Sequence, residues 1–431
     1  MNALAEPVAP VTRVAPLTEV VELNPRPDRA ALPDDLEVSF VPMAAVEAGS
    51  GRMDATAIRR FGEVKKGYTT FREGDVLFAK ITPCMENGKM AVARGLRNGI
   101  ACGSTEFHVL RLRPGVDAHY VYHFVSSARF RAEAAHHMTG AVGQKRVPAA
   151  FLEQCQIPLP DLDEQRRIVA EIEKQFSRLD EAVANLKRVK ANLKRQRSAV
   201  LQAVTSGGLA AEGRSVPRAN EWRWLTVGEL ASPAPRSIQS GPFGSNLKHS
   251  EFQASGKLVI GIDNVRDGEF SLGSNHRISE SKFQELAKYA ARPGDVLITV
   301  MATIGRVCVV PQDIEPAIIT KHVYRISVNR ELAVPNYVAI ALRGSREVRA
   351  QLMGSVQGQT RPGLNGGLIK KVRVPVPPLT YQQSIVAEVD RRLSIVREVE
   401  AEVDVNMKRA QALRQAILFR AFGLSSAGGE T

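Results

Sequence analysis

The sequence has little cysteine, and what it has is not arranged to bind a metal or to form a disulfide framework. Four cysteines occur among 431 residues, none of them in C-x-x-C spacing: Cys84, Cys102, Cys155 and Cys308. This scarcity argues against a disulfide scaffold and a cysteine zinc site, so we expect reduced thiols in the core. The eight histidines form no ligand pattern either, and we therefore predict no bound metal.

Long apolar runs are also missing. No stretch of about 18 or more apolar residues occurs, which a membrane-spanning helix would need. The opening MNALAEPVAP lacks the basic and apolar regions of a signal peptide, and no lipidation signal is present. We expect a cytoplasmic protein without a membrane partner.

Nucleotide-binding motifs are absent as well. The P-loop pattern GxxxxGK[ST] fails at Gly88-Lys89, where Pro83 replaces the first glycine and Met90 follows the lysine. Neither a glycine-rich loop after a strand nor an Asn-Pro-Pro-aromatic motif is found. We therefore do not expect this chain to hydrolyse ATP or to transfer methyl groups by itself.

Positive charge is what the sequence has in excess. Lysine and arginine number 58 against 45 acidic residues, which gives a formal net charge of +13 and a pI of about 9.7. Such an excess indicates a polyanionic partner, with nucleic acid as the first candidate. Hydrophobic residues make up 44% of the chain, enough for more than one core at this length.

One stretch occurs twice and organises the rest of the chain. Residues 157–207 begin with IPLPDLDEQRRIVAEIE, and 217 residues later VPVPPLTYQQSIVAEVD begins the stretch 374–423. Apolar residues recur at every seventh position in both copies: Ile172, Leu179, Leu186, Leu193 and Val200 in the first, and Val389, Val396, Val403, Ala410 and Ile417 in the second. This spacing predicts two long coiled-coil helices of roughly 40 residues each.

The two helices are expected to pair antiparallel. Asp163 and Thr380 are predicted to cap the first turns, and Gln383 would complete a capping box. Glycines follow both helices at Gly207 and Gly423. Basic residues crowd the second half of the first helix, whereas acidic residues occupy the middle of the second. An antiparallel pair brings these opposite charges together, while the apolar seam supplies the association.

The segments in front of the two helices repeat as well. The run GDVL at 74–77 returns at 294–297, and GQKR at 143–146 returns as GQTR at 358–361. Short apolar runs divided by glycine predict strands, so the expected fold class is mixed α/β (α+β), with two similar domains, each followed by a long helix, in pseudo-twofold symmetry. The expected boundaries are a disordered N-terminus at 1–16, a first domain at 17–156, a central helix at 157–210, a second domain at 211–373, a C-terminal helix at 374–424 and a disordered tail at 425–431.

These features together resemble a known family. The order of elements, the paired IPLPxLxEQ-type starts of the helices and the runs KKGYTTFREGDVLFAKITPCMENGKMA and SGPFGSNLK resemble the specificity subunit of type I restriction-modification enzymes. The resemblance covers nearly the whole chain. It implies two target-recognition domains, each of which reads one half of a bipartite site in double-stranded DNA.

The resemblance also implies partners. The helices of that family hold the two domains apart and dock two methyltransferase subunits, and ATP-dependent motor-nuclease (restriction) subunits complete the complex. Such a complex would use S-adenosylmethionine, ATP and Mg²⁺, whereas no cofactor is expected on this chain itself.

Basic and polar loop residues are the candidate DNA contacts, because such side chains suit phosphates and base edges. In the first domain the candidates are Lys65, Lys66, Tyr68, Arg72, Lys80, Lys89, Gln144, Lys145 and Arg146. In the second domain they are Ser245, Asn246, Lys248, Lys321, Gln359 and Arg361.

Four apolar residues lie off the main heptad row and are candidates for docking a partner subunit: Phe176, Val183, Leu393 and Met407. Two other interpretations stay open. One is a coiled-coil scaffold that binds no DNA. The other is a metal-dependent nuclease, because Pro33-Asp34 and Glu63-Val64-Lys65 match the short acidic and E-x-K elements of that class.

Overall fold

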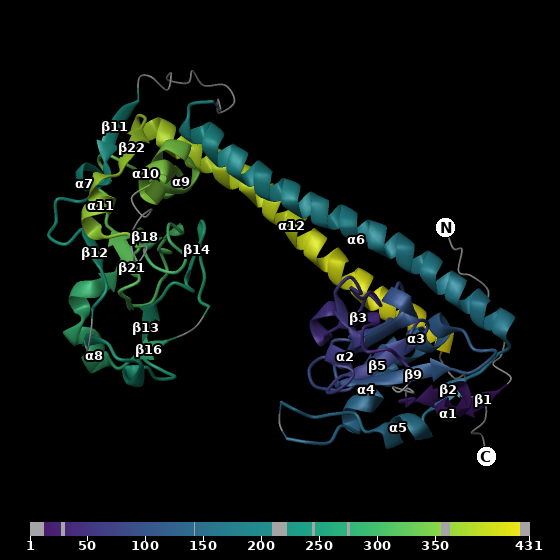
Figure 1. Ribbon diagram of the computed structural model, residues 1–431. Coiled ribbons are helices and arrows are strands. Elements are labelled where there is room, and N and C mark those ends of the chain that lie inside the picture. The colour runs from purple at the N-terminus through teal and green to yellow at the C-terminus, as the bar shows by residue number, and fades with distance from the viewer. Residues whose placement is uncertain are drawn as a thin grey trace, which may run out of the picture. The chain divides into compact units, whose positions relative to one another are not determined.

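The computed structural model describes residues 13–26, 31–141, 143–208, 222–243, 246–273, 276–354 and 363–422 (Figure 1). The chain divides into two compact units. The first unit consists of Met1–Leu186 with Val405–Thr431, and the second consists of Lys187–Asp404. Each unit therefore combines one domain with a segment of both long helices. No helix in the described part of the chain is long and apolar enough to cross a membrane.

The first unit contains two four-stranded sheets that pack face to face. The antiparallel sheet has the order β2 (Val21–Leu23), β9 (Phe107–Leu112), β6 (Val76–Ala79) and β7 (Met90–Val92). The mixed sheet has the order β4 (Ile58–Arg60), β3 (Glu37–Val41), β8 (Ile100–Gly103) and β5 (Thr69–Arg72), with β3 and β8 parallel. In β6, Leu77 and Ala79 share a core with the mixed sheet, while Val76 and Phe78 share one with the helices. Burial on both faces accounts for the continuous apolar run of this strand.

Short helices complete the first domain. Four of them share the core of the antiparallel sheet: α1 (Leu17–Val20), α3 (Ala118–Ser126), α4 (Ala128–His136) and α5 (Ala149–Gln154). Helix α2 (Phe61–Val64) packs on the mixed sheet, and 3-10 turns lie at η1 (Met43–Ala45) and η2 (Arg97–Gly99).

Ordered structure begins earlier than the sequence suggests. Strand β1 (Val14–Pro16) pairs antiparallel with β10 (Gln156–Pro158), which leads into the first long helix. The expectation of a disordered segment at 1–16 is therefore wrong for residues 14–16, since backbone pairing with a distant strand holds them. Residues 1–12 and the expected tail at 425–431 lie outside the described residues.

The two four-stranded sheets of the first unit are repeated strand for strand in the second unit. Its antiparallel sheet has the order β12 (Ile238–Ser240), β21 (Val323–Ile326), β18 (Val296–Thr299) and β19 (Val307–Val309). Its mixed sheet has the order β16 (Arg277–Ile278), β13 (Lys257–Ile260), β20 (Ala317–Ile319) and β17 (Ala290–Ala291), with β13 and β20 parallel. The same orders and directions in both units confirm two similar mixed α/β domains.

The remaining elements of the second unit correspond in part to those of the first unit. Strand β11 (Arg223–Thr226) pairs with β22 (Arg373–Val376) as β1 pairs with β10. A hairpin of β14 (Val265–Arg266) and β15 (Glu269–Phe270) is added. The helices and 3-10 turns are α7 (Val227–Leu230), α8 (Glu280–Glu285), α9 (Pro335–Gly344), α10 (Arg346–Gly354), α11 (Gly366–Lys371), η5 (His249–Glu251) and η6 (Ala287–Tyr289).

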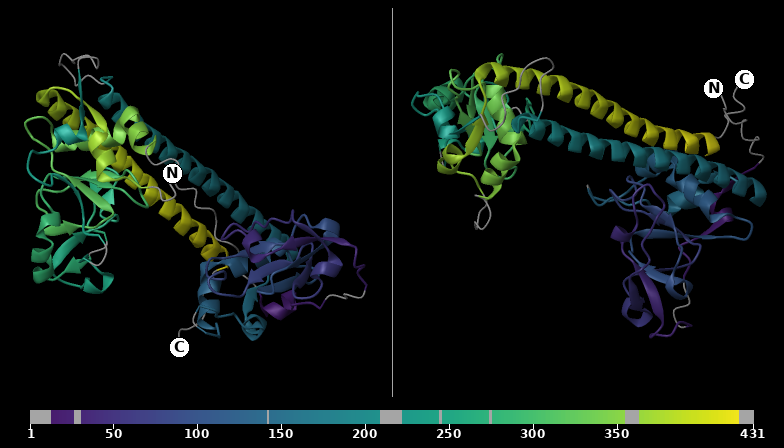
Figure 2. Two further views of the ribbon diagram at one scale, coloured as in Figure 1. Left: turned by 60° about the vertical axis from the view of Figure 1, so that its left-hand side comes forward. Right: turned by 90° about the horizontal axis from the view of Figure 1, so that it is seen from above.

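The two long helices are α6 (Leu162–Thr205) and α12 (Leu379–Phe422), each of 44 residues. Within each unit they lie side by side (Figure 2). In the second unit Val204 shares a core with Ile385, whereas the ammonium of Lys190 lies 2.5 Å from the carboxylate of Asp404, so the helices run antiparallel. In the first unit the α6 residue Asp180 pairs in the same register with Arg414 at 2.7 Å. The predicted antiparallel coiled coil is confirmed.

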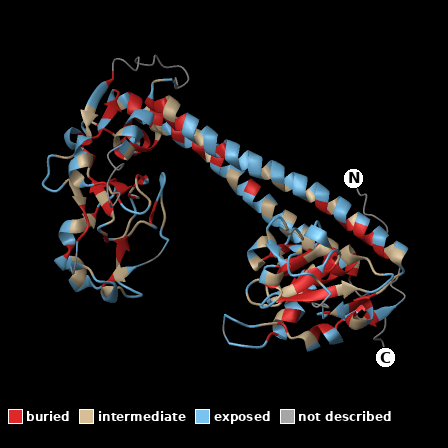
Figure 3. Ribbon diagram, in the orientation of Figure 1, coloured by how far each residue is buried: buried red, intermediate tan, exposed pale blue. Residues whose placement is uncertain are grey.

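The predicted heptad row forms the seam between the helices. Buried residues on this row include Ile172, Leu193 and Val200 of α6 and Val389, Val396 and Val403 of α12. Figure 3 shows exposed positions along much of the remaining helix surface. The seam therefore buries apolar area while the charged positions stay in water.

The helix ends differ in part from the expected caps. Asp161, rather than Asp163, accepts the backbone N–H of Glu164 at 2.8 Å. Helix α12 begins at Leu379, which places Thr380 inside the first turn instead of in front of it. Gly207 ends α6 with φ of +74°, a left-handed conformation that suits glycine, as expected. Gly423 lies outside the described residues.

A buried glutamine fastens the start of each long helix to its own domain. Gln382 Oε1 accepts the N–H of Val334 at 2.8 Å, and its Nε2 donates to the carbonyls of Pro377 at 2.8 Å and Leu332 at 3.2 Å. Gln165 makes the same three kinds of hydrogen bond in the first unit. Both amides are buried, so each one depends on these backbone groups for its hydrogen bonds.

Gln382→Ala should destabilise the second unit by about 2 to 4 kcal/mol, because it removes the three hydrogen bonds of a fully buried side chain and opens a cavity. Urea unfolding followed by tryptophan fluorescence measures this, since both tryptophans, Trp222 and Trp224, belong to the second unit. The matched control Gln383→Ala, at an exposed position of the same turn, should change stability by less than about 0.5 kcal/mol. Equal effects of the two variants would contradict the role of Gln382 in fastening α12 to its domain.

Candidate nucleic-acid interface

The structure brings Lys80 next to segment 144–146, so these predicted DNA contacts can belong to one basic surface. The N–H of Thr82 donates to the carbonyl of Lys145 at 2.9 Å, and the N–H of Val147 donates to the carbonyl of Lys80 at 2.8 Å. These backbone bonds fix the loop along the end of β6. Gln144 and Lys145 are exposed there.

Arg146 is engaged within the domain. Its Nη2 and Nε lie 2.8 and 2.9 Å from the two carboxylate oxygens of Glu106. This bidentate hydrogen bond holds the pKa of Glu106 below its usual range. Arg146 therefore anchors the loop that carries Gln144 and Lys145, and the expected contact of its guanidinium with DNA would first have to break the pair.

A second surface, the Tyr68 cluster, consists of Tyr68, Phe40 and Arg59. The ring of Tyr68 meets the ring of Phe40 edge-on, with centroids 5.0 Å apart, and the guanidinium of Arg59 lies 5.8 Å from the centroid of Phe40. Lys66 and Arg72 are exposed nearby in the sequence. Such an aromatic and basic surface suits stacking and phosphate contacts. Sequence reasoning missed Arg59, although two consecutive arginines, Arg59 and Arg60, were a signal.

Lys65 and Lys89, in contrast, have partners inside the chain. The ammonium of Lys65 lies 2.5 Å from the carboxylate of Asp34, and that of Lys89 donates to the carbonyl of Met43 at 3.0 Å. Asp34 and Lys65 were two of the residues behind the nuclease interpretation, and Glu63 lies on helix α2 rather than on a strand. An acid neutralised by the lysine of its own motif gives that interpretation no support.

The candidates of the second domain are only partly described. Asn246, Lys248 and Lys321 are exposed, whereas Ser245, Gln359 and Arg361 lie outside the described residues. The N–H of Leu364 donates to the carbonyl of Val300 at 3.1 Å, which repeats the bond from Val147 to Lys80 in the first domain. The two GQxR segments therefore precede equivalent anchor points.

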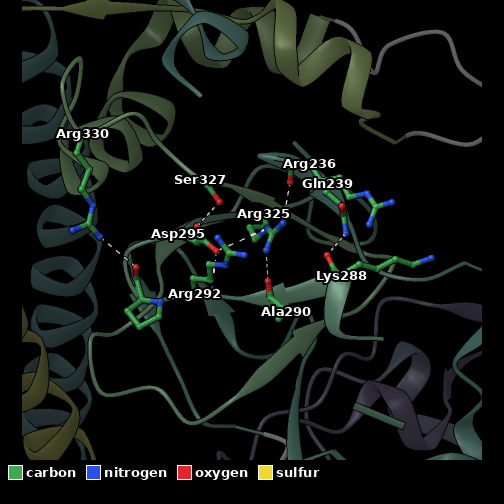
Figure 4. Close-up of polar contacts among 10 residues, drawn as sticks. Arg236, Gln239, Lys288, Ala290, Arg292, Asp295, Arg325, Ser327 and Arg330 are labelled. Carbon is green, nitrogen blue, oxygen red and sulfur yellow. Dashed lines mark hydrogen bonds and ion pairs between the residues drawn. The ribbon is translucent and has the colours of Figure 1, made fainter. Parts of the chain in front are cut away.

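A buried arginine of the second domain, Arg325, binds the backbone of two neighbouring segments (Figure 4). Arg325, on β21, donates to the carbonyl of Ala290 and, at 2.9 Å, to the carbonyl of Arg236. Its Nε lies 3.9 Å from Asp295, whose other oxygen accepts the hydroxyl of Ser327 at 2.6 Å. Burial lowers the pKa of Arg325. The side chain thus ties three backbone segments together and positions the loop that bears Arg236.

Two of the four predicted partner contacts turn out to be core residues. Phe176 and Leu393 are buried in the cores of the first and second units, and the guanidinium of Arg414 lies 3.9 Å from the ring centroid of Phe176. The expectation that these two side chains stand on outer faces is wrong, because each packs against its own domain. Val183 and Met407 are half-buried and keep some surface for a partner.

Comparison with known families connects this architecture to a class of proteins. The family model of the type I restriction modification DNA specificity domain matches residues 13–195 and 245–402, which is most of the chain. The chain belongs to this family.

Curated type I specificity subunits of the family align with the chain over part of its length. The EcoAI specificity subunit of Escherichia coli is 40% identical over 166 residues, covering 38% of this chain and 28% of the relative. The EcoEI specificity subunit of Escherichia coli is 40% identical over 159 residues, covering 37% and 26%. The matched segments thus span little more than a quarter of these two relatives.

A solved structure shares the fold of this chain over nearly its full length. It comes from work on complex assembly and conformational transition of a type I R-M system, with a TM-score of 0.76 at 21% identity. The match covers 96% of this chain and 98% of the other. At this identity the likeness establishes the two-domain, two-helix fold.

In this member of the specificity family, Arg325→Met should destabilise the second unit by about 3 kcal/mol, because it leaves buried Asp295 without its cation. Scanning calorimetry of the full chain measures the loss. The control Arg330→Met removes an exposed arginine of the same loop region, which donates to the carbonyl of Pro293 at 3.4 Å, and should change stability by less than about 0.5 kcal/mol. An unchanged transition in Arg325→Met would mean that the buried charge contributes nothing.

Proposed function

We propose that this chain is the non-catalytic DNA-recognition subunit of a type I restriction-modification complex in the cytoplasm. Each of its two domains reads one half of a bipartite site in double-stranded DNA. The observation that carries the proposal is the duplicated two-sheet domain within the match to the DNA specificity family.

Charge and surface chemistry support this role. The net charge of +13 favours a polyanion, and affinity would come mainly from phosphate neutralisation by exposed lysines and arginines. Base contacts would come from the Tyr68 cluster, Gln144 and Lys145 in the first domain. Asn246, Lys248 and Lys321 are their candidates in the second.

The partners in this proposal are two methyltransferase subunits and restriction subunits, which supply the chemistry with S-adenosylmethionine, ATP and Mg²⁺. The long helices offer surface for docking them. Ile395 and Val399 are large apolar residues exposed on α12 in the second unit, and Leu413 and Phe419 are exposed on it in the first. Exposed apolar side chains beside a formed seam favour contact with another protein.

Exchange of residues 211–373 for those of a relative with another target should change one half of the methylated motif and leave the other half intact. The reason is that each unit has its own core and its own basic loops. The measurement is genome-wide mapping of methylated adenines in a host that expresses the chimaera with its methyltransferase. A change in both halves would refute independent reading by the two domains.

Lys66→Ala combined with Lys145→Ala should weaken DNA binding by the complex at every sequence and reduce the slope of log K against log salt by about 1 to 2. Titrations of labelled duplex at several salt concentrations measure both quantities. The charge-matched control, Lys174→Ala with Lys187→Ala on α6, should keep the slope. If the parent complex itself shows no salt-dependent binding, the scaffold interpretation is favoured instead.

A further inference from the structure

Three potential metal ligands converge in the first unit. His119 and His123 lie four residues apart on α3, so they face the same side of that helix. Glu173 faces them from α6, and its Oε1 lies 3.2 Å from Nδ1 of His119. One ligand atom from each of the three lies within 4.8 Å of the others. The expectation that the histidines form no ligand pattern overlooked this spacing.

Three of the four nitrogens of the two imidazoles are buried and have no hydrogen-bond partner. His123 is 4% exposed, and neither of its ring nitrogens has a hydrogen-bond partner. Nε2 of His119 is likewise buried and unpaired. Buried polar atoms are nearly always satisfied, so two such rings on one face require an explanation.

The second unit shows that the architecture itself does not require these histidines. Positions 119, 123 and 173 correspond, 217 residues later, to Asn336, Ile340 and Asp390. Ile340 is buried in the core of the second unit at the place where the first unit holds His123. An apolar side chain therefore satisfies the same packing. A buried imidazole at this position serves something other than packing.

We propose that His119, His123 and Glu173 bind one divalent transition-metal ion of the Zn²⁺ class and thereby link α3 to α6. Two imidazoles with one carboxylate are a ligand set that Zn²⁺ accepts, whereas Mg²⁺ and Ca²⁺ prefer oxygen ligands alone. Three protein ligands leave a coordination position for water or a further ligand.

The charges around the site are mixed. Arg94 and Arg414 act against a cation, while Glu173 and Asp117 favour one. Arg414 is itself paired with Asp180 at 2.7 Å, which reduces its effect. The ion would bind one nitrogen of each imidazole and fasten the first domain to the first long helix, independently of any DNA contact.

The experiment uses the full chain, purified without a polyhistidine tag and stripped with a chelator. Co²⁺ is titrated in as a visible probe and then displaced with Zn²⁺. We expect one equivalent of Co²⁺ to give visible absorption bands, and Zn²⁺ to remove them and raise the Tm by roughly 5 °C. Elemental analysis of the protein as purified counts the resident metal.

Variants taken from the second unit test the ligands with little risk to folding. His119→Asn and His123→Ile copy the residues at the equivalent positions, and Glu173→Gln alters an exposed side chain. Each should weaken Co²⁺ binding by about 100-fold or more, since loss of an outer partner alone costs up to about 100-fold. The control His136→Gln, an exposed histidine on α4, should bind as the parent does.

The outcomes separate clearly. Absence of Co²⁺ absorption in the parent, or parental affinity in Glu173→Gln, overturns the site. Weak binding in all three ligand variants with normal binding in His136→Gln supports it. If His123→Ile fails to fold, His119→Asn and Glu173→Gln decide the question by the same measurement.

Discussion

The packing of α6 against α12 completes the core of both units, and the other contacts of each domain are built around it. In the first unit Phe176 of α6 and Phe422 of α12 belong to one apolar cluster with α3 and the antiparallel sheet. In the second unit Leu201 and Leu393 play the corresponding parts. Removal of either helix would open both cores at once, so the apolar seam supports folding as well as pairing. The buried glutamines then set the point at which each helix leaves its domain.

The two units share their architecture and differ in how it is stabilised. Asp75 and Asp295 occupy equivalent turns, yet Asp75 pairs with Arg111 of the adjacent strand, whereas Asp295 accepts a hydroxyl from Ser327 and faces the buried Arg325. These differences lie in the turns that precede β6 and β18. A common scaffold with separately held loops is what two domains need if they are to recognise different sequences.

Periodicity and repetition were enough to predict the helices, their antiparallel pairing and the two domains, because heptads and duplicated turns are local signals. They could not predict contacts made across long distances. Phe176 lies off the heptad row, and it is buried because the first domain packs against that face of α6. Arg146 meets Glu106 40 residues away, and His119 meets Glu173 on another helix. The spacing of the histidines was visible, but the carboxylate that completes the set was not.

The first unit can complete its core only after the second unit has been translated, because the end of α12 belongs to the first unit. Phe422 packs edge-on against Tyr120 and Phe124, with ring centroids 5.1 and 5.6 Å apart, although the whole second unit is translated between them. At about 5 to 20 residues per second, the first domain therefore waits some tens of seconds for the helix that covers it. During that interval its aromatic surface is bare, and a chain that stops before Phe422 would never cover it. The last turns of α12 thus complete the core of the first domain by packing alone.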